Sequence, residues 1–373
     1  MTDSNDPTLA PAPGQGRPKP GLSAYHESSQ FKHWRYSRAG LDKLRTELNE
    51  KSKEVTARNV AAEKAAQESL GHTSSLLTPA YLSVADELLL VRFYCSHAST
   101  ICRQGFGSPE EVEATAISYI KRFYLKNSVM EWHPKQIMPT CLYLAAKTTN
   151  HNIPIEVFVK KFEKFKAEEV LDLEFLVAQS LSFEFWVRGA ERALRGWALE
   201  LQSSPITGAG ERAQRALPKA LQALSASRMT DAEFLFSPAQ IALACYRLAD
   251  RELTDAFLAA KYDSAEEGNV PFGIAQDGLL RISGEVEAMI QTGEAQHDLK
   301  KVKEVDKRLK GCANPEKVPG TALYIKRKAE REAKAEQDKK EKQDKAARAR
   351  EADGMVFGRD LKQPAANGDP FEG

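Results

Sequence analysis

One short stretch of sequence occurs twice, and this repeat constrains the fold more than any other feature. Residues 134–146 read PKQIMPTCLYLAA, and residues 238–249, which begin 104 positions later, read PAQIALACYRLA. Each copy starts with proline, which is favoured at the first position of a helix. Each is apolar on nearly every face, which is typical of a helix buried among others. A repeated central helix predicts two similar helical domains in tandem.

The rest of the chain supports an all-α fold, because hairpin and strand signals are almost absent. We expect two helical domains, with flanking helices at both ends and disordered tails beyond them. The predicted parts are a disordered tail (1–30), a flanking helix region (31–75), two helical domains (76–190 and 191–295), a second flanking helix (296–321) and a charged, largely disordered tail (322–373). Within that tail, residues 326–351 carry charges at helical spacing and could instead form a solvated helix.

Charge and cysteine content exclude several classes of protein. The 53 basic and 52 acidic residues leave a net charge of +1, so a whole-chain electrostatic grip on nucleic acid or on an anionic membrane is not expected. The five cysteines lack CxxC spacing, which argues against a disulfide scaffold and a zinc site. No apolar run approaches the roughly 18 residues of a membrane span, and the polar N-terminus has no signal core. We therefore expect neither secretion nor membrane insertion.

No catalytic constellation is evident in the sequence. It contains no glycine-rich phosphate loop, no HExxH and no GxSxG. Cysteines such as Cys141 and Cys245 lie in apolar helices, where a small buried side chain is the usual role. His133 precedes a helix start, which favours capping or packing over metal ligation. We expect no catalytic residue, no metal and no cofactor.

Two charged residues in apolar surroundings stand out. Lys147 follows the apolar run 144–146, and Glu174 interrupts the apolar run 170–177. Charges in such settings are rarely left without a partner. The residues allow two interpretations, a structural ion pair at the edge of a core or a pair of polar anchors on a partner-binding face.

Several segments resemble the cyclin family. Residues 119–134 (YIKRFYLKNSVMEWHP) and 141–147 (CLYLAAK) are similar to a cyclin box, and two tandem boxes agree with the repeat. Within the family, residues 123–134, 32–37 (KHWRYS) and 235–243 (LFSPAQIAL) are specifically similar to H-type cyclins. The resemblance covers roughly residues 31–305.

The resemblance implies a non-catalytic regulatory subunit that activates a cyclin-dependent kinase of the CDK-activating or TFIIH type. Such a subunit supports phosphorylation of the RNA polymerase II C-terminal domain, transcription and the cell cycle. The implied partners are the kinase catalytic subunit, a RING-finger assembly factor and the TFIIH core, and the implied location is the nucleus. No direct contact with nucleic acid or membrane is expected.

The family's kinase-binding Lys/Glu pair corresponds to Lys147 and Glu174. Phe162, Phe165 and Val170 are further interface candidates, and we expect core packing for at least one of them. Three alternatives remain open at this point. They are a C- or L-type transcriptional cyclin, a nucleic-acid-binding cyclin-box protein like the TFIIB core, and a helical adaptor without a kinase.

Overall fold

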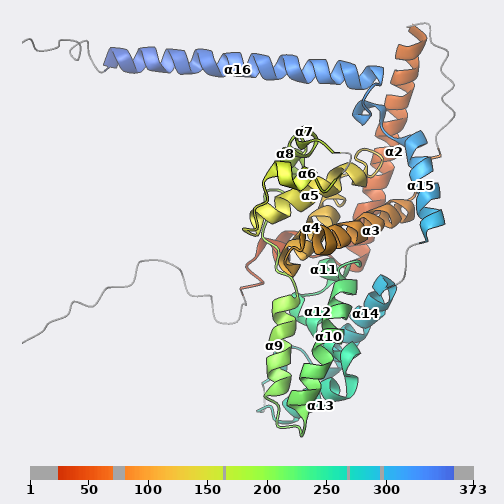
Figure 1. Cartoon of the computed structure of the whole chain (residues 1–373), viewed down its shortest axis with the longest axis vertical. Coiled ribbons are helices and arrows are strands. Elements are labelled where there is room, and N and C mark those ends of the chain that lie inside the picture. The colour runs from red at the N-terminus through yellow and green to blue at the C-terminus, as the bar shows by residue number, and fades with distance from the viewer. Residues whose placement is uncertain (1–23, 70–79, 163–164, 267–268, 295–297, 357–373) are drawn as a thin grey trace, which may run out of the picture. The chain divides into compact units, whose positions relative to one another are not determined.

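The computed structural model describes residues 24–69, 80–162, 165–266, 269–294 and 298–356 (Figure 1). These residues form helices and connecting turns, with no strand among them, so the predicted all-α class is confirmed. The expected tail segments 1–23 and 357–373 lie outside the described residues. The chain divides into two compact units, one of residues up to 54 and 80–312, the other of residues 55–79 and from 313 onward.

The first helical domain is built around the first copy of the repeat. Its helices are α3 (Val84–Thr100), α4 (Glu110–Phe123), α5 (Pro134–Thr148), α6 (Ile155–Val159), α7 (Ala167–Leu171) and α8 (Glu174–Ser180), with a π-helical turn, η1 (Ile101–Phe106), after α3. Helix α5 contacts α3, α4, α7 and α8 and buries Ile137, Cys141 and Leu144. His133 caps it, because its Nδ1 accepts a hydrogen bond from the Lys135 backbone N–H at 3.0 Å.

The second helical domain repeats this plan around α12. Its helices are α9 (Glu191–Gln202), α10 (Ala209–Ser227), α11 (Ala232–Leu235), α12 (Pro238–Ala249), α13 (Arg251–Asp263) and α14 (Gln276–Glu294), with a 3-10 turn, η2 (Pro271–Gly273), before α14. Helix α12 contacts α9, α10, α13 and α14, and its Cys245 is fully buried. Ser237 and Gln240 close a reciprocal capping box at its start. The prediction of two central buried helices is thus confirmed.

The C-terminal flanking helix α15 (Leu299–Cys312) follows the second domain in sequence but packs on the first. Val302, Val305 and Leu309 enter the core of the first domain, and α15 contacts α3. Its Asp306 carboxylate lies 2.9 Å from the ring of His133. The last helix of the first unit therefore completes the domain that comes first in sequence.

The beginning of the described chain differs from the expected disordered tail. Residues 24–27 form a turn that leads into α1 (Ser29–His33). The Gln30 side chain is buried and bonds to the backbone of Arg188 twice, accepting from its N–H at 2.7 Å and donating to its carbonyl at 3.3 Å. Tyr25 is buried as well. The local composition did not predict this ordered structure, because the bonding partner of Gln30, Arg188, is distant in sequence.

Ion pairs and a small apolar cluster join the second domain to the first domain and to the N-terminal flanking helix. Arg45, on α2 (Arg38–Ser69), forms two hydrogen bonds with Asp231, at 2.6 and 2.7 Å. Lys121 lies 2.8 Å from Glu233. A third, smaller core is formed by Trp34 at the end of α1, Leu41 on α2, Leu125 after α4 and Phe234 on α11.

The second unit contains the end of α2, the 3-10 turn η3 (Pro315–Lys317) and α16 (Ala322–Val356). Glu63 accepts hydrogen bonds from the backbone N–H groups of Ala322 at 3.0 Å and Leu323 at 2.9 Å, which caps α16. The described side chains of α16 are almost all exposed. This segment is therefore a solvated helix where the domain division expected a largely disordered tail.

Candidate functional site

The two charged residues singled out from the sequence form an ion pair. Lys147 lies in the last turn of α5, and Glu174 is the first residue of α8. The Lys147 Nζ and a Glu174 carboxylate oxygen are 2.5 Å apart. A cation at a helix C-terminus and an anion at a helix N-terminus both complement the helix dipole. The structural ion pair expected as one interpretation is therefore present.

This pair is a surface feature and not a buried one. The Lys147 side chain is 43% exposed and that of Glu174 is 22% exposed. The Lys147 ammonium also lies 5.4 Å from the centre of the Tyr143 ring. Pairs this accessible typically contribute no more than about 1 kcal/mol to stability. Exchanging the pair for contacts with a partner would therefore cost the fold little.

Large apolar side chains are exposed on the same helix and the turn that follows it. Phe175, directly after Glu174, is 68% exposed, and Phe183 is 55% exposed. Leu171, at the end of α7, is also exposed. Grouped exposed apolar side chains mark interaction surfaces more often than single ones do. These residues were not among the predicted interface residues, although the run around Glu174 holds more apolar residues than one buried helix face can use.

The backbone beneath Phe183 is strained. Ser182 and Phe183 have φ angles of 55° and 58°, in the left-handed region that bulky residues rarely adopt. The Phe183 ring lies 6.1 Å from that of Phe175 and 6.3 Å from that of Phe185. Such strain is concentrated at functional sites. Here the left-handed backbone conformation exposes the Phe183 ring to solvent beside α8.

The other three predicted interface residues lie in different settings. Val170 is 1% exposed and belongs to the core of the first domain, as expected for at least one of them. Phe162 is half-buried, with its ring 5.1 Å from that of Phe158. Phe165 is also half-buried, 5.9 Å from Phe162. Both phenylalanines therefore keep a face that a partner can reach. Val170, in contrast, anchors α7 to the core of the first domain.

The described residues offer no group of three or more histidine, cysteine or acidic side chains able to hold a metal ion. All five cysteines are buried as free thiols. Burial raises the pKa of the Cys95 and Cys245 thiols to about 12, so they remain protonated and act as packing residues. In the part of the chain that the structure describes, no helix is long and apolar enough to cross a bilayer.

Two family models match the two helical domains. The model for the N-terminal domain of cyclins matches residues 102–185, and that for the cyclin C-terminal domain matches residues 190–313. The cyclin mcs2 of Schizosaccharomyces pombe is 33% identical over 310 residues, which are 83% of this chain and 91% of that protein. The chain is a cyclin.

Further relatives place it beside the H-type cyclins. Cyclin-H of Xenopus laevis is 31% identical over 228 residues, 59% of this chain and 66% of that one. Among solved structures, a chain of the CAK complex of Chaetomium thermophilum has a TM-score of 0.69 at 27% identity, covering 83% of this cyclin and 94% of that chain. A chain of the yeast TFIIK (Kin28/Ccl1/Tfb3) complex has a TM-score of 0.55 at 28% identity, covering 71% and 100%.

One of the segments that carry the H-type likeness, residues 123–134, includes a turn bonded to α8, the helix that begins with Glu174. The Asn127 amide donates to the Phe123 carbonyl at 3.1 Å and to the Ser180 hydroxyl on α8 at 2.9 Å. Glu87 accepts from the Ser128 hydroxyl at 2.9 Å and from the Val129 N–H at 3.2 Å. Burial raises the pKa of Glu87, and these hydrogen bonds partly offset that effect. The turn thereby ties α8 to α3 and α4.

Proposed function

We propose that this cyclin binds and activates a cyclin-dependent kinase of the CDK-activating or TFIIH type through the surface around Lys147 and Glu174. One observation carries the proposal: a solvent-accessible ion pair, 2.5 Å long, lies at two helix ends beside the exposed rings of Phe175 and Phe183. Partner interfaces commonly combine a few oriented polar groups with aromatic anchors.

The chemistry of the pair suits a kinase backbone. Lysine donates hydrogen bonds to carbonyl oxygens and glutamate accepts them from N–H groups, so together they can bind both groups of an exposed peptide segment. Apolar side chains around the pair would exclude water from these bonds and strengthen them. The cyclin residues bind and do not react, so this chain acts as a regulatory subunit.

Activation follows from differential affinity. A kinase αC helix held inward brings its glutamate to the β3 lysine that positions ATP. A cyclin that binds this conformation more tightly than the inactive one shifts the population toward it. In the proposal Phe162 and Phe165 extend the contact surface beside α7, and Val170 maintains the shape of that helix.

The proposal extends to a larger assembly. Two similar solved chains belong to complexes named CAK and TFIIK, and the second of these names Kin28, Ccl1 and Tfb3 as its components. By likeness, the partners of this cyclin would be a kinase catalytic subunit, a RING-finger assembly factor and the TFIIH core. Its place of action would be the nucleus, in transcription and cell-cycle control.

The test is to replace both charges, Lys147→Ala with Glu174→Ala, in the full-length chain and to co-express it with its kinase. We expect an unchanged thermal transition, because the pair adds about 1 kcal/mol at most. We expect kinase binding and peptide phosphorylation to fall at least tenfold, because truncated interface anchors commonly cost 2 kcal/mol or more.

A matched control is the Lys261–Glu200 pair, 3.5 Å apart and also exposed, on the second domain. Lys261→Ala with Glu200→Ala should leave kinase activation unchanged. Full activation by the Lys147/Glu174 variant would overturn the proposed interface. Recovery of a different kinase type from cells would overturn the H-type assignment.

A further inference from the structure

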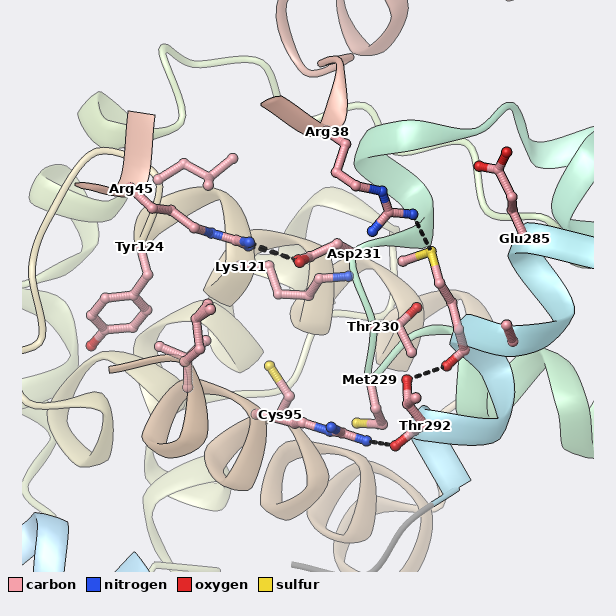
Figure 2. Close-up of a pocket in the computed structure, with 16 residues that line it drawn as sticks. Arg38, Arg45, Cys95, Lys121, Tyr124, Met229, Thr230, Asp231, Glu285 and Thr292 are labelled. Atoms are coloured by element: carbon pink, nitrogen blue, oxygen red, sulfur yellow. Dashed lines mark hydrogen bonds and ion pairs between the residues drawn. The ribbon is translucent and has the colours of Figure 1, made fainter. Parts of the chain in front are cut away.

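The cavity between the two domains has a volume of about 460 Å³, and the cations that line it bind groups of the same chain. The Arg38 guanidinium contacts the Met289 sulfur at 3.8 Å. Arg92 donates a hydrogen bond to the Thr292 carbonyl (Figure 2). These contacts join α2 and α3 to α14, so this cavity belongs to the packing of the domains against each other.

A different hollow lies on the second domain and shares no residue with the proposed kinase surface. It has two adjoining parts, of about 380 and 960 Å³, which have Trp197, Ala239 and Phe272 in common. Tyr25 lines the smaller part and Leu199 lines the larger one. We refer to the two parts together as the aromatic groove. It extends from the beginning of the described chain to the surface of α9.

The two rings shared by both parts of the groove are held in place by the fold. The Trp197 indole N–H donates to the Ala239 carbonyl at 3.1 Å, and the centre of its ring lies 5.4 Å from that of Phe272. The Tyr262 hydroxyl donates to the Ile274 carbonyl at 2.6 Å, which fixes the turn that carries Phe272. Rings that are already ordered lose little conformational entropy when they bind.

Apolar side chains are exposed in this groove on a strained backbone. Phe272 has a φ angle of 58°, in the left-handed region, and its side chain is 51% exposed. Leu199, which lines the groove, and Val270, at the start of the same turn as Phe272, are also more than half exposed. Strain and grouped exposed apolar side chains both indicate a binding surface.

Aromatic-lined grooves bind proline-rich segments, because proline is apolar and its fixed φ leaves little conformational freedom to lose. This chain contains such a segment directly before the groove-lining Tyr25. Residues 7–20 include five prolines, and the last four of these residues read RPKP. The seven-residue step from Pro18 to Tyr25 spans about 22 Å when extended. Pro18 can therefore reach the rings that line the same hollow as Tyr25.

The charges of the groove assign a direction to this segment. Glu200 and Glu266 line the larger part, together with one cation, Lys261, which lies 3.5 Å from Glu200. The smaller part holds Arg35, whose guanidinium donates to a backbone carbonyl at 2.7 Å. Residues 17–20 carry two cations and no acid. Their charge is therefore complementary to the larger part, which lies beyond the shared rings from Tyr25.

We propose that the aromatic groove binds residues 17–20 of the same chain, which holds the N-terminal segment on the second domain. The prolines pack against Trp197 and Phe272, and the two cations face Glu200 and Glu266. The short tether favours this segment over a free proline-rich partner, because it gives an effective concentration in the millimolar range. Since the groove and the proposed kinase surface share no residue, emptying the groove should leave kinase affinity unchanged.

The experiment adds a fluorescent peptide of residues 10–22 (APAPGQGRPKPGL) to two full-length chains and follows its anisotropy. One is the natural chain, and the other carries Pro18→Ala with Pro20→Ala. We expect saturable binding to the variant and at least tenfold weaker binding to the natural chain, in which the tethered segment competes. The same peptide with both prolines replaced by alanine should bind the variant at least tenfold more weakly.

Two outcomes would overturn the proposal. Equal binding of the peptide to both chains would mean that the groove is open in the natural chain and available to a proline-rich partner. Absence of binding to either chain would mean that the groove does not recognise this segment.

Substitutions in the groove locate the site within the chain that carries Pro18→Ala and Pro20→Ala. Phe272→Gly should weaken peptide binding about tenfold, and glycine adopts the φ of this position without strain. Leu199→Ala should weaken it about threefold, since it removes apolar contact area. Leu299→Ala on α15 is the matched control, because the two leucines are 64% and 58% exposed. Unchanged affinity in both groove variants, or an equal loss in the control, would exclude this groove as the site.

Discussion

Lys147 and Glu174 show how the place of a residue on a helix can leave its charge accessible to a partner. Each lies at the helix end whose dipole its charge complements, so neither needs the other in order to be tolerated. The pair remains exposed while apolar neighbours such as Phe175 stay exposed beside it. The same chemistry within a core would be a costly buried ion pair. Location therefore makes this pair available to a partner.

At the same scale, a substitution of Phe183 can distinguish an effect on kinase binding from an effect on folding. Phe183→Gly removes an exposed ring and places glycine at a φ of 58°, a conformation that glycine adopts without strain. We expect the free energy of unfolding to stay the same or rise by a few tenths of a kcal/mol, measured by urea denaturation. We expect kinase affinity to fall about tenfold or more, measured by surface plasmon resonance.

Phe272 provides the control for that substitution, because it is also an exposed aromatic with a φ of 58°, on the second domain. Phe272→Gly should relieve similar strain and leave kinase affinity unchanged. An equal loss of affinity in both variants would argue against a specific role for Phe183.

Among the elements, α15 decides how the first domain is completed. Its polar sequence carries apolar residues at helical spacing, and Val302, Val305 and Leu309 enter the core of a domain that ends more than a hundred residues earlier. Its Asp306 also contacts the residue that caps α5. The first domain is therefore not a continuous segment of the chain.

Leu309→Ala tests this arrangement. Leu309 is 2% exposed, and truncating a buried leucine typically costs about 3 kcal/mol through lost contacts and the cavity left behind. Leu299→Ala on the same helix, where the side chain is 58% exposed, should change stability by less than about 0.5 kcal/mol. Urea denaturation checks both variants, and equal, small effects would mean that α15 does not stabilise the first domain.

At the scale of the whole molecule, two large cores and one small one lie within the first compact unit, and charged contacts link them. Arg45–Asp231 and Lys121–Glu233 lie beside the small apolar cluster that contains Trp34. Charged contacts of this kind hold two domains in one orientation more effectively than apolar area alone, since their geometry is directional. They also make the arrangement sensitive to pH.

The lowered pKa of Asp231 predicts how stability depends on pH. Its burial would raise its pKa, but the hydrogen bonds and charge of Arg45, with the charges of Lys121 and Arg38, outweigh this and lower the pKa. The stabilising contribution is therefore fully present above the unfolded pKa, about 3.9, and is lost as pH falls through the lower folded value.

We accordingly expect Asp231→Asn to lose roughly 2 kcal/mol at pH 7 and to show a shallower further loss than the natural chain as the pH falls below about 4. Chemical denaturation across that range measures the difference. Asp263→Asn, at an exposed position, should follow the natural chain at every pH. Parallel acid profiles for Asp231→Asn and the natural chain would contradict this account.

Much of the fold and part of the site followed from local pattern. The two proline-led apolar helices predicted α5 and α12, because a helix without a polar face must be buried. The embedded charges pointed to Lys147 and Glu174, because a charge in apolar surroundings is rarely left without a partner. Phe183 was missed, since its exposure depends on a left-handed turn that no composition signal announces. The order of residues 24–30 was missed because Gln30 finds its partners at Arg188.

The amino-acid sequence was sufficient for the helical class, the tandem repeat and the cyclin resemblance, because each depends on spacing and residue type along the chain. The placement of α15, the exposed aromatic surface and the inter-domain cavity depend on contacts between residues far apart in sequence. Arg38 and Arg92 are unremarkable on their own helices. They line one cavity because α2, α3 and α14 each contribute residues to its walls.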